Sequence, residues 1–61
     1  MVTQEAIDHA VKLFGKEVVY QAMEVVAMSD PDGAWTMLED TGQFEMAEAI
    51  EFLYFDGAAD D

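Results

Sequence analysis

The sequence predicts an all-α protein, a small bundle of three to four short helices. Apolar residues recur every three or four positions along most of the chain, the period that places them on one face of a helix. No sustained stretch has the two-residue alternation of a strand. A chain of 61 residues buries only about 60% of the surface that its unfolded form exposes. We therefore expect a single helical domain over residues 1–57 and a frayed acidic tail over residues 58–61.

The first half of the chain predicts two helices on either side of Gly15. Thr3 is a suitable N-cap for the first helix, and its apolar face comprises Ile7, Ala10, Val11 and Phe14. Asp8 and Lys12 are a favourably ordered pair one turn apart on the outside of this helix. The second helix covers about residues 16–28, with an apolar face of Val18 or Val19, Ala22, Met23 and Val26. A lone glycine costs only about 1 kcal/mol inside a helix, so the sequence allows a continuous helix here as well as a break.

Pro31 marks the clearest break in the chain. It disfavours a helical backbone at Asp30 and is well placed as the first residue of a third helix. The Asp30 side chain is a suitable N-cap for this helix. We predict that the third helix runs to about Asp40 and that residues 41–42 separate it from a fourth.

The fourth predicted helix covers about residues 43–55 and is ended by Gly57. Its apolar residues fall on two overlapping lines, which are Ala47, Ile50 and Tyr54 and also Met46, Ile50 and Leu53. Phe44, Phe52 and Phe55 cannot all share the side that these lines define, because together they span far more than one helical stripe. At least one of the three aromatic rings is therefore expected to be exposed.

Charge divides the chain into two unequal parts. The formal net charge is -12, from 14 acidic and two basic residues. Residues 1–28 hold four acids and both lysines, whereas residues 29–61 hold ten acids and no base. Glu51 and Asp56 lie toward the C-terminal end of the last helix, where the helix dipole opposes them. We therefore predict that the second part faces a basic partner, through Glu39, Asp40, Glu45, Glu48, Glu51 and Asp56.

One basic surface that suits such carboxylates is the phosphate-binding groove of a nucleic-acid enzyme, where acids on a helical frame stand in for phosphates. The sequence thus predicts a small acidic protein-binding module, an inhibitor or regulator of the DNA-mimic kind. The simpler alternative is that the acids only keep an apolar mini-protein in solution. In size and charge the chain is similar to small acidic proteins with which bacteriophages disable host enzymes, which implies a location in the host cytoplasm.

Large apolar side chains are abundant, with seven aromatic residues and five methionines. Four of the methionines are interpreted as core filler, namely Met23, Met28, Met37 and Met46. Three aromatic residues are candidate anchors of an apolar contact, namely Trp35, Phe52 and Phe55. These anchors support a second hypothesis, a structural or adaptor module that self-associates into a homo-oligomer.

Composition disfavours several function classes. The absence of cysteine removes disulfides and thiolate zinc sites and makes a reducing, cytoplasmic setting the expectation. The longest apolar run, residues 25–28, is far too short to span a membrane. The negative charge disfavours direct contact with nucleic acid or an anionic membrane. We expect no enzyme and no cofactor, because no nucleophile lies in an activating context and no glycine-rich phosphate loop is present.

Two stretches contain residue types found in metal sites. Residues 30–33 with Glu39 are similar to part of a calcium-binding EF-hand loop, but Met28 occupies the place of the first ligand. His9 is the only histidine, and one histidine without cysteine is a poor ligand set. We expect His9 to be a solvated or partly packed helix residue, and we predict no metal site.

Overall fold

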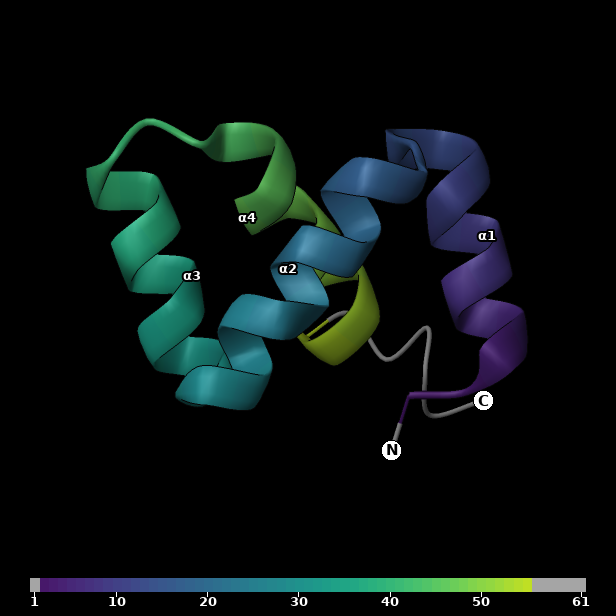
Figure 1. Ribbon diagram of the computed structural model, residues 1–61, viewed down its shortest axis with the longest axis horizontal. Coiled ribbons are helices and arrows are strands. Elements are labelled where there is room, and N and C mark those ends of the chain that lie inside the picture. Colours follow the sequence, from purple (N-terminus) through teal and green to yellow (C-terminus); the bar gives the residue numbers. More distant parts are fainter. Residues whose placement is uncertain (1, 56–61) are drawn as a thin grey trace.

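A computed structural model describes residues 2–55, which form four α-helices and a terminal π-helical segment. The elements are α1 (Gln4–Phe14), α2 (Lys16–Met28), α3 (Pro31–Asp40), α4 (Phe44–Ile50) and η1 (Glu51–Phe55). No strand occurs within residues 2–55, so the predicted all-α bundle is confirmed. In Figure 1, α2 crosses the centre of the molecule between α1 and α3, and α4 packs against both α2 and α3. None of these helices is both long enough and apolar enough to cross a membrane.

Local hydrogen bonds define the predicted helix starts. Thr3 Oγ1 accepts a hydrogen bond from the Ala6 backbone N–H at 3.1 Å, and Asp30 Oδ1 accepts one from the Gly33 N–H at 2.6 Å. Both predicted N-caps are confirmed, and each such cap typically contributes about 1 kcal/mol. Pro31 is the first residue of α3, where its missing N–H leaves no helical hydrogen bond unmade.

Gly15 makes the corner between α1 and α2. Its φ of 97° lies in the left-handed region that glycine adopts without a steric penalty. The Gly15 N–H donates to the Val11 carbonyl at 2.9 Å, and its own carbonyl accepts from the Val19 N–H at 3.1 Å. The structure therefore has a break where the sequence also allowed a continuous helix, and this break lets α1 pack against α2.

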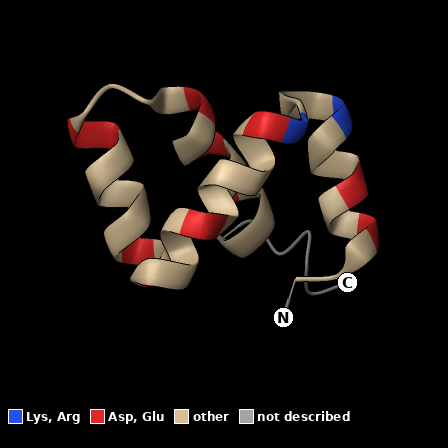
Figure 2. Cartoon of the chain, viewed as in Figure 1, with Lys and Arg blue, Asp and Glu red and all other residues tan. Residues whose placement is uncertain are grey.

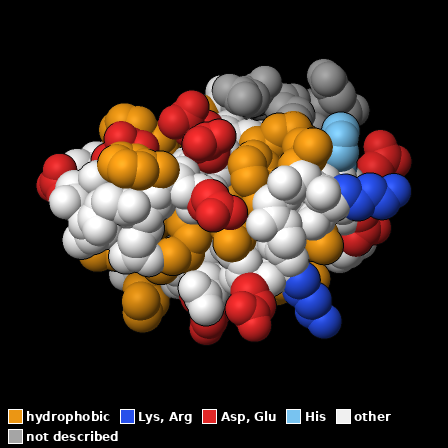
Figure 3. Space-filling view, turned by 90° about the horizontal axis from the view of Figure 1, so that it is seen from above, with side chains coloured by type: hydrophobic (Ala, Val, Ile, Leu, Met, Phe, Trp, Pro, Cys, Tyr) orange, Lys and Arg blue, Asp and Glu red, His pale blue; other side chains and the backbone are white. Residues whose placement is uncertain are grey.

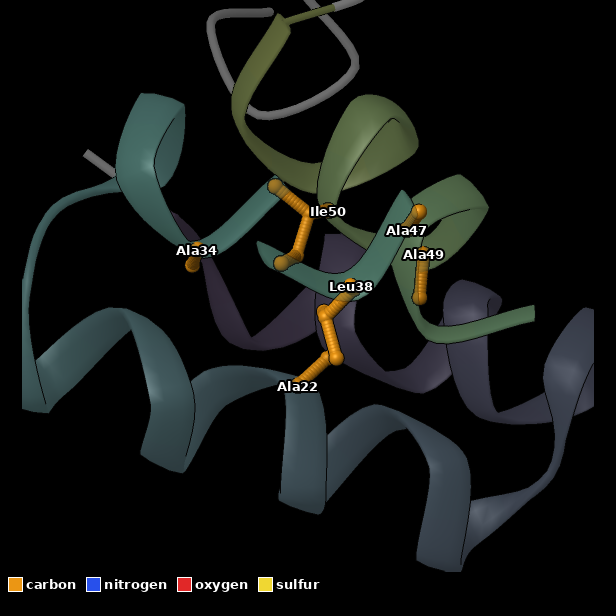
Figure 4. Close-up of a cluster of buried hydrophobic side chains, with 6 residues drawn as sticks. All are labelled: Ala22, Ala34, Leu38, Ala47, Ala49 and Ile50. Atoms are coloured by element: carbon orange, nitrogen blue, oxygen red, sulfur yellow. The ribbon is translucent and has the colours of Figure 1, made fainter. Parts of the chain in front are cut away.

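The core consists of two clusters of buried side chains. One cluster joins α2, α3 and α4 (Figure 4) and comprises Ala22, Ala34, Leu38, Ala47, Ala49 and Ile50. The other joins α1, α2 and η1 and comprises Ala6, Ala10, Val19 and Leu53. Phe14 and Tyr54 pack against both clusters and connect them. Among residues 2–55 the largest fully buried side chains are Leu38, Ile50, Leu53 and Val19.

The last helix departs from the prediction after Ile50. An α-helix was predicted to about Phe55, but residues 51–55 are π-helical. A π turn contains more residues than an α turn, so consecutive side chains diverge by a smaller angle. This allows Leu53 to be buried while its neighbours Phe52 and Tyr54 are both half-buried.

Burial and exposure along this helix agree with the aromatic crowding that the sequence predicts. Phe44 is 55% exposed and Phe55 is 43% exposed, which confirms that not every ring can be covered. Burial raises the pKa of the Tyr54 phenol above its ordinary value of 10.0. The predicted helix end at Gly57 and the predicted tail at residues 58–61 lie outside the described residues.

Replacement of Leu38 with alanine should lower the free energy of unfolding by about 2–5 kcal/mol, because it opens a cavity between three helices. Leu13→Ala is the matched control, since Leu13 is 58% exposed and Leu38 is 1% exposed. The control should change stability by no more than about 0.5 kcal/mol. Denaturant unfolding followed by circular dichroism measures both variants, and equal effects would contradict the assignment of Leu38 to the core.

Candidate binding surface

The predicted acidic site is centred where α3 ends and α4 begins. Asp40, Glu45 and Glu48 are exposed, and Glu39 is half-buried. Figure 2 shows acidic positions at the end of α3 and at the start of α4, on either side of the connecting turn. The bundle thus places acids from two helices at one junction.

Backbone hydrogen bonds hold this junction in shape. The Gln43 N–H donates to the Leu38 carbonyl at 2.8 Å, and the Gly42 N–H donates to the Glu39 carbonyl at 3.2 Å. Gly42 has a φ of 77°, which favours glycine at this tight turn. These backbone hydrogen bonds therefore determine the positions of the neighbouring acidic residues, and no salt bridge is needed for this.

The positive charges lie at the other end of the molecule. Lys12 is in the last turn of α1 and Lys16 is the first residue of α2, so both belong to the corner around Gly15. Figure 2 shows this separation, and in Figure 3 acidic side chains spread over the face while the lysines lie at one end. Residues 29–55 contain seven carboxylates and no lysine or arginine. A surface of one sign attracts a partner of the opposite sign.

Glu51 has an internal partner. Its Oε2 atom accepts a hydrogen bond from Trp35 Nε1 at 2.8 Å, which links α3 to η1. Both residues are half-buried, and a hydrogen bond to an ionised acceptor is stronger than a neutral one. Interactions within the last helix do not explain an acid at this position. The hydrogen bond to Trp35, which is a tertiary contact, does explain it.

Phe52 also has internal partners. Its ring meets the ring of His9 nearly edge-on at a centroid distance of 5.3 Å and that of Phe14 at 6.2 Å. His9 is exposed but packed on this side, in agreement with the prediction for it. Among the three candidate apolar anchors, Trp35 and Phe52 are therefore engaged within the bundle, and Phe55 is exposed. Asp56, the last of the candidate acids, lies outside the described residues.

An apolar groove between α2, α3 and the start of α4 was missed by the sequence analysis. Met28 is 81% exposed and Met37 is 48% exposed, so the prediction that they fill the core is wrong. Together with the half-buried Met46 they line a groove of about 490 Å³, whose walls also include Val25 and Leu38. We call these five residues the methionine groove. Helical spacing predicts which residues share a face, but it cannot predict whether another helix covers that face.

The stretch that is similar to part of an EF-hand loop forms the start of α3. Asp30 Oδ1 is used as the cap on the Gly33 N–H, and Asp32 lies exposed in the first turn. An acid in a first helical turn interacts favourably with the helix dipole. Among residues 2–55 no group of three or more potential ligands is arranged to hold a metal ion.

No known protein family, curated protein or solved structure matches this chain.

The hydrogen bond between Trp35 and Glu51 predicts an energetic coupling between these residues. In a double-mutant cycle, Trp35→Phe and Glu51→Ala should be non-additive by about 0.5–1.5 kcal/mol, because either change alone removes the bond. Urea unfolding of the four proteins measures the coupling. Glu48→Ala, one turn earlier and exposed, is the control partner for Trp35→Phe and should be additive. Additivity in both cycles would contradict a stabilising bond.

Proposed function

We propose that this chain is a small acidic protein-binding module that occupies a basic surface on a partner, and that the partner handles nucleic acid. The observation that carries the proposal is the run of seven carboxylates without a cation over residues 29–55. Asp40 and Glu45 are exposed on either side of the turn between α3 and α4, and Glu48 is exposed three residues further along α4. The absence of cysteine suits a reducing compartment, so we expect this contact in the cytoplasm.

The charge density supports imitation of DNA. The Cα atoms span 28 × 20 × 17 Å. Residues 2–55 hold 11 acids and two lysines, a formal net charge of -9. Duplex DNA carries one charge per about 1.7 Å of axis, so a duplex 28 Å long carries about 16. The described residues therefore carry more than half of the charge of DNA of the same length. A groove that binds phosphates would attract this chain by the same long-range field, and occupation of that groove would inhibit or regulate the partner.

The position of Asp40 argues against a role in solubility alone. Asp40 is the last residue of α3, where the helix dipole disfavours a carboxylate. Acids that served only solubility would be equally effective at positions that stabilise the helix. Asp32, in the first turn of the same helix, is an acid at such a position.

The alternative of a self-associating module has weaker support. Trp35 and Phe52, two of its three candidate anchors, make contacts within the bundle. Association through the third candidate anchor, the exposed Phe55, would also bring two strongly acidic molecules together. Like charges oppose such a contact. We therefore favour a basic partner over a second copy.

Reversal of Asp40, Glu45 and Glu48 to lysine should abolish capture of the partner while the helical content is retained. The tagged protein is immobilised, exposed to lysate of the native host and washed with duplex DNA. We expect the wild type to retain a basic, nucleic-acid-handling protein that duplex DNA releases, because DNA and the acidic surface compete for the same groove.

The matched control reverses Glu5, Asp8 and Glu17, which are exposed acids of α1 and α2. Both triple variants change the net charge by the same amount, so a difference between them reports position. Capture that persists in the Asp40, Glu45 and Glu48 variant, or that is lost equally in the control, would contradict a specific acidic site.

A further inference from the structure

We propose that the methionine groove binds an amphipathic helix of the partner, with the apolar side of that helix in the groove and its basic side against the surrounding acids. This inference rests on the proposed function and specifies the part of the partner that is recognised. It adds an apolar contact to the acidic one.

The groove has the composition of an adaptable apolar binding site. Met28, Met37 and Met46 come from α2, α3 and α4, and Val25 and Leu38 complete the walls. Methionine side chains are unbranched and polarisable, so they adjust to the shape of an apolar partner. Met28 is 81% exposed. Covering so apolar a side chain removes its surface from water, which favours binding of a partner.

Carboxylates lie in the wall of the groove and in two neighbouring hollows. Glu24 is part of its wall. Met37 is shared with a neighbouring hollow that is lined by three acids, Asp30, Asp32 and Asp40. Met46 is shared with another hollow, to which Glu45 contributes. An apolar strip with acids along its margins is complementary to apolar side chains flanked by lysine or arginine.

A helix suits this groove better than other occupants. Residues 2–55 contain no strand, so they offer no sheet edge to which an extended peptide could add. A groove between helices accepts apolar side chains spaced by one helical turn, the pattern of an amphipathic helix. A second copy of the chain or an anionic membrane would bring negative charge to a negative margin. A basic amphipathic helix is the occupant that complements both the apolar groove and the acids next to it.

The test uses a synthetic amphipathic helix of leucine and lysine, about four turns long, and NMR of the methionine methyl groups. Binding of this peptide should shift the methyl signals of Met28, Met37 and Met46. The signal of Met23, which packs against the other core cluster, should stay in place and serves as an internal control.

The variant Met28→Gln with Met37→Gln should bind the peptide at least about tenfold more weakly, because burial of the two side chains contributes to the affinity. Both positions are exposed, and glutamine forms helices about as well as methionine. Leu13→Gln, an exposed apolar residue of α1, is the control and should leave binding unchanged.

Three outcomes would overturn the inference: unchanged affinity in the double glutamine variant, equal binding of a lysine-only peptide, or groove methyl signals that shift with protein concentration alone. The first two would leave the acidic function intact, whereas the third would indicate a second copy as the occupant. Undiminished peptide binding by the Asp40, Glu45 and Glu48 reversal variant would also overturn the inference, because Asp40 and Glu45 line hollows next to the groove. The proposed acidic function fails on a separate result, which is that this variant still captures the partner from lysate. The failure of the groove and the failure of the acidic site are thus distinguishable.

Discussion

Close packing of α2, α3 and α4 around Leu38 and Ile50 is the interaction on which the rest of the molecule depends. Alanines on all three helices allow them to approach until these two side chains are fully buried. Such a core is small for a chain with a net charge of -12, whose carboxylates repel one another. The same packing determines where α3 ends and α4 begins, and hence where the exposed acids lie. Fold and acidic surface are therefore products of one helix arrangement.

The acids of the second part of the chain differ in what they do for the fold. Asp30 caps α3, and Glu51 accepts the indole hydrogen bond of Trp35, so both have internal functions. Asp40 and Glu48 are exposed, and neither caps a helix or holds another side chain in the way that Asp30 and Glu51 do. This division separates acids that stabilise the fold from acids that we propose contact a partner. The proposed partner contact concerns the second group.

Local chemistry explains which features could be predicted from the sequence. Thr3 and Asp30 cap their helices and Gly15 ends α1 through hydrogen bonds within a few residues, so their roles are readable from the chain itself. The bond between Trp35 and Glu51 joins residues 16 positions apart and needs the tertiary fold. The change to π-helix after Ile50 occurs in a segment that contacts α1 and α4, and the spacing of apolar residues did not predict it.

The methionine groove is a second feature that could not be predicted from the sequence, because it depends on how the helices pack. Met28 and Met37 were predicted to fill the core because they are large and apolar, but their exposure follows from the absence of a covering helix within residues 2–55. An exposed apolar strip beside several acids is difficult to explain as a stabilising feature. It is readily explained as a surface that a basic, apolar partner covers.

We propose that the exposed acids are retained for a contact outside the chain, at some expense to stability. The most direct measurement is the free energy of unfolding of Asp40→Asn with Glu48→Gln against that of the wild type, at low and at high salt. The neutralised variant should be more stable by about 0.3–1 kcal/mol at low salt, because an unfavourable dipole interaction and charge repulsion are removed. The difference should shrink at high salt, where charges are screened. A variant less stable than the wild type at low salt would show that these acids serve the fold, and would contradict the claim.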